Sequence, residues 1–294
     1  MTDHAHRLNA HYDALAGTHE GSLRQRLQRA FREAGCDPDR LTLDASAGID
    51  QLHLGGRRAS RSLARLGKLS PGARVLDVGC GTGGASRLLA DEHGVEAIGV
   101  DITAAFIEVA EWLSQATGLA QKTRFLCADA ARVPLADGEI DVIWCQHALM
   151  NMPDAAAVLA EWRRLLVPGG QVLLHEVVAG DNPAPLALPV PWARSAATSH
   201  LTTRTRLECM LADAGFVAGQ VDDVTAAALD WRRKHGRREK AAGGTAQPLA
   251  KGPALPGPAL IFGEQFVQMG KNLAANLADD RVRIIEGVWH KGKV

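Results

Sequence analysis

The chain has 294 residues, of which 46% are hydrophobic, enough for one large domain or one domain with a cap. Its 33 basic and 33 acidic residues balance to a formal charge of zero, so we expect neither nucleic acid nor an anionic membrane as a partner. No apolar run reaches about 18 residues, and the first residues lack the charged and apolar regions of a signal peptide. We therefore expect a cytoplasmic protein.

The N-terminal part is predicted to be helical. Apolar residues recur at helical spacing within 20–34, and 57–66 has the same pattern. Residues 1–68 are therefore interpreted as a helical flap or cap that precedes the core.

From residue 73 the pattern alternates between buried strands and amphipathic helices. This alternation predicts an α/β fold with a doubly wound, mostly parallel, Rossmann-like sheet, whose core spans 69–222. The strands are expected at 73–78, 95–100, 123–127, 140–146 and 171–178, and the helices at 84–93, 104–117 and 154–166.

Two further strands complete a predicted seven-stranded sheet. A helix over 204–214 precedes a strand over 216–221, and 281–294 supplies a final strand that returns antiparallel beside it. The intervening 223–280 is predicted to be a helical cap insertion. Its segment 234–258 concentrates Lys, Arg, Gly, Ala and Pro, and we expect a mobile loop there, followed by helical periodicity over 262–277.

The sequence VLDVGCGTGG, residues 75–84, is an apolar strand followed by a glycine-rich turn that opens a helix. Gly79 and Gly81, with Cys80 between them, let the backbone turn sharply and approach a ligand. The turn also fits the dinucleotide pattern GxGxxG, so a nicotinamide-dependent oxidoreductase is an alternative. Asp77, however, would repel a pyrophosphate and suits a cationic ligand such as the ammonium and sulfonium of S-adenosylmethionine.

Later strand ends supply further cofactor candidates. Asp101 follows Gly79 by 22 residues, near the offset at which an acidic side chain meets ribose hydroxyls. Asp129 can accept a hydrogen bond from an adenine amino group. Its apolar companions Ile102 and Ala130 can flank the ring.

In these segments the chain resembles class I S-adenosylmethionine-dependent methyltransferases. Its pattern is most similar to that of the bacterial sarcosine and dimethylglycine N-methyltransferases. The resemblance implies S-adenosylmethionine as cofactor, S-adenosylhomocysteine as product and a small-molecule methyl acceptor. It covers nearly the whole chain and is carried by DQLHLGG at 50–56, VLDVGCGTGG, GVDIT at 99–103, CADAARVPL at 127–135, WCQHALMN at 144–151, VPGG at 167–170 and PVPWA at 189–193.

Acceptor-side candidates follow the strand predicted at 140–146. Ligands in open α/β sheets lie beyond the carboxyl ends of strands, so Gln146 should face the cofactor and His147 the acceptor. His147 is a catalytic candidate, with a core or capping histidine as the alternative. Asn151 could orient a polar acceptor or cap the following helix.

Three more candidates depend on the resemblance. Tyr12, the only tyrosine, would lie in a flap over the cofactor and contribute to catalysis, or would pack within an N-terminal helix. His53 would lie near the methionine end of the donor, or contact a neighbouring helix. Trp192 would line the acceptor pocket, with core packing as its alternative.

The favoured function is methyl transfer from S-adenosylmethionine to a small molecule, with nitrogen slightly ahead of oxygen, sulfur and carbon as the nucleophile. Besides the oxidoreductase, a non-catalytic S-adenosylmethionine-binding protein is an alternative. The five cysteines are scattered without CxxC spacing, so neither disulfides nor a metal site is expected. A homodimer is one candidate oligomeric state, which the sequence does not decide.

Overall fold

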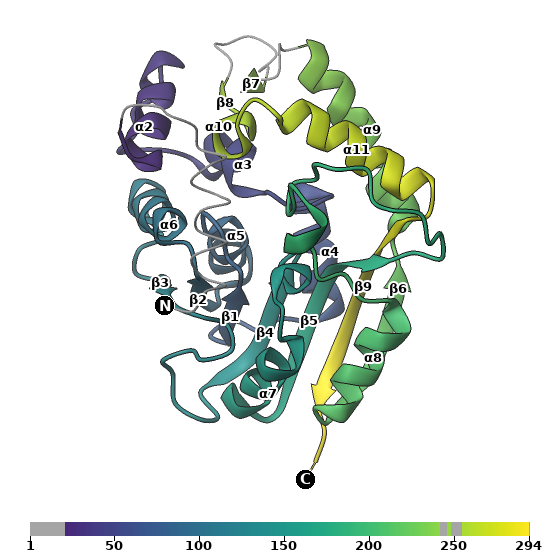
Figure 1. Ribbon diagram of the computed structural model, residues 1–294. Coiled ribbons are helices and arrows are strands. Elements are labelled where there is room, and N and C mark those ends of the chain that lie inside the picture. The colour runs from purple at the N-terminus through teal and green to yellow at the C-terminus, as the bar shows by residue number, and fades with distance from the viewer. Residues whose placement is uncertain (1–20, 242–245, 248–254, 294) are drawn as a thin grey trace.

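The computed structural model describes residues 21–241, 246–247 and 255–293 (Figure 1). Within them a seven-stranded sheet has the order β3-β2-β1-β4-β5-β9-β6, and β9 runs antiparallel to both of its neighbours. The predicted doubly wound, mostly parallel sheet is thus confirmed, and its order reverses between β1 and β4. The strands are β1 Arg74–Val78, β2 Glu96–Asp101, β3 Thr123–Cys127, β4 Ile140–Gln146, β5 Leu166–Ala179, β6 Phe216–Asp223 and β9 Val282–Lys291.

Helices cover both faces of this sheet because its central strands are apolar on both sides. In β4, Val142 and Trp144 pack against the face that carries α4 and α5, while Ile143 and Cys145 pack under α7 and α8. The helices flanking the sheet are α4 Gly56–Leu66, α5 Gly84–His93, α6 Ala104–Ala116, α7 Ala155–Leu165 and α8 Arg204–Asp213.

A helical cap lies beyond the carboxyl ends of the parallel strands (Figure 1). It joins N-terminal helices to the predicted insertion through an apolar cluster that includes Leu27, Phe31, Phe262 and Phe266. Its members are α2 Leu23–Glu33, α3 Leu43–Asp50, α9 Thr225–Ala241, α10 Ala259–Phe262 and α11 Phe266–Ala278, with the short strands β7 Ala246–Gln247 and β8 Leu255–Pro256. Among the described helices, none is long and apolar enough to cross a membrane.

The cap differs from the prediction in two places. The segment expected to leave the helical pattern at residue 234 continues as α9 to Ala241. Its Arg, Lys and Glu residues are good helix formers, and Lys234 forms an ion pair with Asp230 one turn earlier at 2.6 Å. Residues 242–245 and 248–254 of the expected loop lie outside the described residues. The helix expected over 262–277 is divided at Gly263, whose φ is +74°.

Candidate active site

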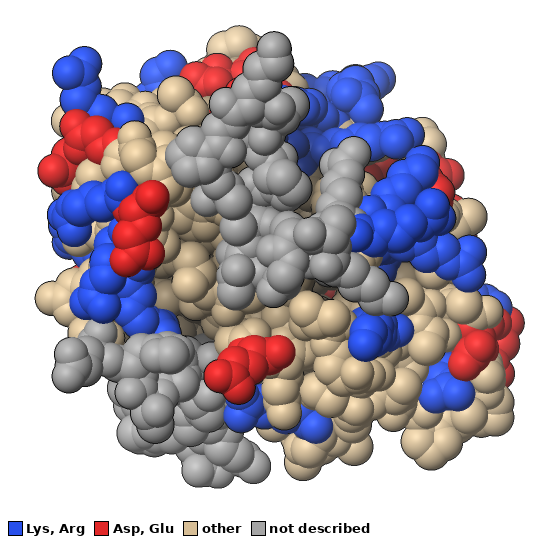
Figure 2. Space-filling view, turned by 90° about the horizontal axis from the view of Figure 1, so that it is seen from above, with Lys and Arg blue, Asp and Glu red and all other residues tan. Residues whose placement is uncertain are grey.

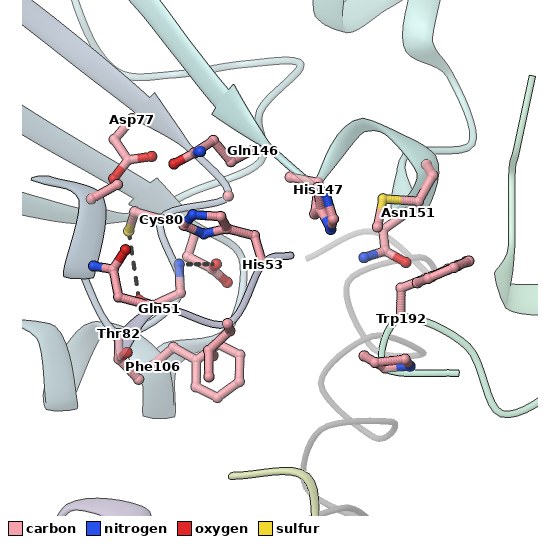
Figure 3. Close-up of a pocket in the computed structure, with 18 of the residues that line it drawn as sticks. Gln51, His53, Asp77, Cys80, Thr82, Phe106, Gln146, His147, Asn151 and Trp192 are labelled. Carbon is pink, nitrogen blue, oxygen red and sulfur yellow. Dashed lines mark hydrogen bonds between the residues drawn. The ribbon is translucent and has the colours of Figure 1, made fainter. Parts of the chain in front are cut away.

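A cavity of about 720 Å³ opens beyond the carboxyl ends of β1, β2 and β4, under the cap. Figure 3 shows Asp77, Cys80 and Gln146 on one side of it and Asn151 and Trp192 on the other, with His147 between them. We name the first side the glycine-turn half. The second, completed by residues of α9, α10 and α11, is the cap half.

The glycine turn leaves no room for a side chain at Gly79. Gly79 has a φ of +71°, and a Cβ there would lie 2.4 Å from the Cβ of Ala148. The backbone N–H groups of Gly79 and Cys80 both donate to the carbonyl of Val100, at 2.8 and 3.1 Å. The Cys80 side chain packs with Ile107 in a small apolar cluster, and burial raises the pKa of its thiol. Gly79, Cys80 and Gly81 all line the cavity.

Two carboxylates frame this turn. Asp77 accepts hydrogen bonds from the backbone N–H and the hydroxyl of Ser86, at 3.1 and 2.6 Å, and burial raises its pKa to about 6. Asp101 accepts from the backbone N–H groups of Gly81, at 2.9 Å, and Thr103, at 2.8 Å, and burial also raises its pKa. Asp101 thus holds the turn while it lines the cavity. Buried carboxylates of this kind favour a cationic or hydroxyl-bearing ligand.

The other predicted cofactor residues also line the cavity. Ile102, Asp129 and Ala130 come from the loops after β2 and β3. Gln146 accepts hydrogen bonds from Trp144 Nε1, at 3.0 Å, and from Ser60 Oγ, at 3.1 Å. Its buried Nε2 has no partner among the described residues, so the amide is available as a donor to a ligand.

Three histidines meet at the centre of the site, of which His175 is buried and His53 and His147 are half-buried. His147 and His175 stack with ring centroids 5.0 Å apart, and His53 lies edge-on to both, at 6.1 and 6.0 Å. Burial lowers the pKa of His53 to about 4 and that of His175 to about 3, and burial with both neighbouring rings lowers the pKa of His147. All three imidazoles are therefore neutral at pH 7. Across the described residues, no His, Cys, Asp or Glu group has an arrangement that could hold a metal ion.

His147 and His53 differ in their hydrogen bonding. His147 has a φ of +51°, and its buried Nε2 has no partner among the described residues. Nε2 of His53 lies 3.2 Å from the carbonyl of Gly56 and 3.1 Å from Oγ of Ser60. His53 thus lines the cavity and also contacts α4, which was its alternative interpretation.

Asn151 does not cap the next helix. It ends the short 3₁₀ helix Leu149–Asn151, whereas Asp154 caps α7 by accepting from the backbone N–H of Ala157 at 3.0 Å. The Oδ1 atom of Asn151 is buried without a partner among the described residues. The capping alternative is therefore wrong, and the amide lines the cavity.

Glu176 holds the segment that carries His147 and Asn151, a role not predicted from the sequence. One carboxylate oxygen accepts from the backbone N–H groups of Ala148 and Leu149, at 3.1 and 2.9 Å, and the other accepts from Val177, at 2.9 Å. The residue is 1% exposed, and burial raises its pKa to about 7. The sequence signal that could have indicated this role is the position of Glu176, an ionisable residue, within an otherwise apolar strand.

This geometry predicts a pH-dependent contribution of Glu176 to stability. Because its folded-state pKa lies above that of an unfolded glutamate, the contribution is fully present below about pH 4.5 and is lost as the pH rises through about 7. Between those limits the free energy of unfolding of wild type, measured with urea, should fall by up to about 3 kcal/mol relative to that of Glu176→Gln. Glu96→Gln on the exposed start of β2 is the control. Parallel pH profiles for wild type and Glu176→Gln would contradict the assignment.

Trp192 combines both of its predicted roles. Its ring is 3% exposed and packs with Val190 and Leu273, while Nε1 donates to Oγ of Ser199 at 3.0 Å. The residue also lines the cavity. Tyr12 lies outside the described residues, and its predicted role stays a prediction.

Comparison with known proteins agrees with this architecture. Residues 76–174 match the family described as "Methyltransferase domain". This segment is a methyltransferase domain. It contains the glycine turn, the ends of β2 to β4 and most of β5, and the predicted resemblance is confirmed.

Relatives of this methyltransferase domain differ in their acceptors. Methyltransferase GfsG of Streptomyces halstedii is 35% identical over 132 residues, 45% of this chain and 48% of that protein. Another curated relative is named as a tocopherol O-methyltransferase, and a solved structure that is 14% identical is named as a geranyl diphosphate C-methyltransferase. The matched part of the chain spans 48% of the length of GfsG and 29% of that of the tocopherol O-methyltransferase. The activity of the whole protein is therefore a proposal.

Solved structures share the fold at low identity. Phosphoethanolamine N-methyltransferase 2 of Haemonchus contortus, in complex with phosphomonomethylethanolamine and S-adenosylhomocysteine, has a TM-score of 0.70 at 19% identity, covering 93% of this chain and 61% of that one. A protein of Galdieria sulphuraria assigned as a sarcosine dimethylglycine methyltransferase has a TM-score of 0.67 at 18% identity, covering 85% and 96%. These likenesses establish the methyltransferase fold of the chain.

Proposed function

We propose that the chain is an S-adenosylmethionine-dependent methyltransferase that acts on a small molecule. The observation that carries this proposal is one cavity that connects the carboxylate-framed glycine turn of a methyltransferase domain to unpartnered polar atoms of His147 and Asn151. A donor bound at the turn and an acceptor bound under the cap would meet at His147.

The glycine-turn half fits the donor. Asp101, which lines the cavity, would accept hydrogen bonds from the ribose hydroxyls, while Asp129, Ile102 and Ala130 are available to hold the adenine. The raised pKa of Asp77 is expected to fall when a cationic ligand binds nearby, since opposite charge stabilises the carboxylate. The unpartnered Nε2 of Gln146 would donate to a donor oxygen.

S-Adenosylmethionine supplies an activated methyl group on its sulfonium sulfur. The protein must align the acceptor with that carbon and sulfur, and such alignment can lower the barrier by about 7–11 kcal/mol. His147 would receive the proton that the acceptor loses, because its imidazole is neutral and its Nε2 is unpartnered. Asn151 would orient the acceptor by accepting a hydrogen bond, and Tyr12 would contribute as a flap residue.

The nature of the nucleophile is part of the proposal. The slight preference for nitrogen rests on the resemblance to N-methyltransferases, while relatives are named for nitrogen, oxygen and carbon acceptors. A neutral imidazole can serve an amine or a hydroxyl. A cytoplasmic location and the absence of a nucleic-acid partner remain expectations, and a homodimer remains one candidate oligomeric state.

Titration calorimetry with S-adenosylmethionine, S-adenosylhomocysteine and NAD tests the donor assignment. We expect both sulfur compounds to bind and NAD to give no binding heat, because Asp77 and Asp101 would face its pyrophosphate. Binding of NAD without either sulfur compound would favour the oxidoreductase. Binding of the sulfur compounds without any methyl transfer would favour the non-catalytic alternative.

A further inference from the structure

We propose that Ser60 is a positioning residue whose hydroxyl prepares Gln146 and His53 to hold the amino-acid end of the methyl donor. The inference rests on the proposed methyltransferase function and concerns the glycine-turn half of the cavity. It is carried by a chain of hydrogen bonds that joins α4, the segment before it and the end of β4.

The hydroxyl of Ser60 lies at the centre of this chain. Ser60 is 0% exposed, and its Oγ lies 3.1 Å from Oε1 of Gln146 and 3.1 Å from Nε2 of His53. Oε1 of Gln51 is a further acceptor, but at 3.5 Å it is at the limit of a hydrogen bond. A hydroxyl has one proton to donate, so the closer oxygen of Gln146 receives it.

A second donor fixes the orientation of the Gln146 amide. Nε1 of Trp144 lies 3.0 Å from Oε1 of Gln146, and an indole nitrogen can only donate. The atom that faces it is therefore the amide oxygen, which accepts from both Trp144 and Ser60. The amide nitrogen is left buried and without a partner among the described residues, and Gln146 lines the cavity. Gln146 thus offers an N–H donor to a ligand.

The same reasoning places the ring proton of His53. Its Nε2 lies 3.2 Å from the carbonyl of Gly56, and a carbonyl can only accept. Because burial lowers the pKa of His53 to about 4, the neutral ring carries one proton at pH 7, on Nε2, and Nδ1 keeps a lone pair. That proton is shared with Oγ of Ser60, whose own proton goes to Gln146. His53, which lines the cavity, thus offers an acceptor to a ligand.

One donor and one acceptor match the amino-acid end of S-adenosylmethionine. A carboxylate only accepts hydrogen bonds, as it would from Nε2 of Gln146, and an ammonium only donates, as it would to Nδ1 of His53. Figure 3 shows Gln146 and His53 on the same side of the cavity as Cys80 of the glycine turn. Since the adenosine end is assigned to Asp101 and Asp129, the amino-acid end is the part of the donor left for this pair.

Ser60 acts on the donor through its partners. It is not among the described residues that line the cavity, whereas Gln146 and His53 are. Without the hydroxyl, Oε1 of Gln146 keeps only the indole of Trp144 as a donor, so the amide is less firmly held. The ring proton of His53 still has the carbonyl of Gly56 as an acceptor. We therefore expect most of the effect of Ser60 to pass through Gln146.

Calorimetry on the full chain tests this by comparing S-adenosylhomocysteine with 5′-methylthioadenosine, which keeps the adenosine and the sulfur but lacks the amino-acid end. Both compounds have no net charge at pH 7.5, so the Lys and Arg side chains that gather on the side of the molecule where α9 lies (Figure 2) favour neither. Ser60→Ala should weaken binding of S-adenosylhomocysteine about three- to tenfold and binding of 5′-methylthioadenosine less than about twofold.

The matched control is Ser62→Ala. Ser62 belongs to the same helix, but its hydroxyl donates to Glu286 at 2.9 Å and it is not among the described residues that line the cavity. This variant should bind both compounds as wild type does. The melting temperature of each variant shows whether it is folded.

Two further measurements separate positioning from a general loss of structure. If Ser60 acts through Gln146, Ser60→Ala should weaken binding of S-adenosylhomocysteine much less in a Gln146→Leu background than in wild type. Nitrogen NMR of the histidine rings of wild type without ligand should show His53 as the neutral form protonated on Nε2. The signal of His53 is identified by its loss in His53→Gln.

The possible failures are distinguishable. Wild-type affinity for S-adenosylhomocysteine in Ser60→Ala, an equal loss for both compounds, independent effects of the Ser60 and Gln146 substitutions, or a proton on Nδ1 of His53 would each overturn the inference. Failure of wild type to bind either compound would overturn the proposed function and with it the ligand assignment. The position of the His53 proton, which needs no ligand, would still test the hydrogen-bond chain.

Discussion

His147→Ala should lower the rate of methyl transfer by about 10²-fold or more and change the affinity for S-adenosylmethionine little. The unpartnered Nε2 of His147 lies between the two halves of the cavity, where the acceptor would lose its proton in the proposed reaction. The donor contacts assigned to Asp77 and Asp101 are untouched by this substitution. Single-turnover kinetics on the donor-saturated enzyme would measure the loss.

The pH dependence of this reaction follows from the burial of His147. An exposed histidine would titrate near pH 6.5, but burial and the adjacent His175 and His53 lower the pKa of His147. Its protonation should therefore give no inflection in the rate between pH 6 and 9. His147→Gln can still orient an acceptor but cannot take its proton, so it separates the two roles. Wild-type rates in both variants would remove His147 from the mechanism.

Asp101→Ala should weaken donor binding about 10- to 150-fold, equivalent to about 1.5–3 kcal/mol for hydrogen bonds to a charged group. The substitution removes the acceptor assigned to the ribose hydroxyls. It also removes the carboxylate that receives the backbone N–H groups of Gly81 and Thr103, so the turn itself becomes less well ordered. Calorimetry with S-adenosylhomocysteine would measure the change.

Asp101→Asn is the matched variant, because it retains one oxygen acceptor and the size of the side chain. Its affinity should lie between those of wild type and Asp101→Ala. A melting temperature for each variant would show whether lost binding reflects unfolding. Unchanged donor affinity in Asp101→Ala would contradict the assignment.

The core of the fold is predictable from sequence because its signals are local. The alternation of apolar strands and amphipathic helices gave β3 as Thr123–Cys127, β4 as Ile140–Gln146 and α5 as Gly84–His93. The helices of the cap are harder to predict from sequence, because they are stabilised by contacts between distant segments. Low hydrophobicity within 234–241 indicated a loop, yet good helix formers and the packing of α9 against α11 give a helix there.

The site likewise contains residues that the sequence indicates and residues that only the folded structure brings together. Asp77 and Asp101 lie at the ends of β1 and β2 and the glycines follow β1, where chain order alone indicates which residues face a ligand. The role of Glu176 depends on tertiary contacts. Its carboxylate accepts from backbone N–H groups of the connection that follows the neighbouring strand β4. The close approach of His53, His147 and His175 likewise comes from three separate segments.

The most direct test of the central claim is transfer of a labelled methyl group. The protein is incubated with a metabolite extract and an equal mixture of S-adenosylmethionine carrying CH₃ or CD₃, and the products are analysed by mass spectrometry. We predict a new small molecule that appears as a doublet separated by the mass difference of the two methyl groups, together with S-adenosylhomocysteine. The doublet should be absent with Asp101→Ala at low donor concentration. Donor binding by calorimetry without any doublet, across extracts that contain both polar and apolar metabolites, would contradict the claim that this chain is a small-molecule methyltransferase.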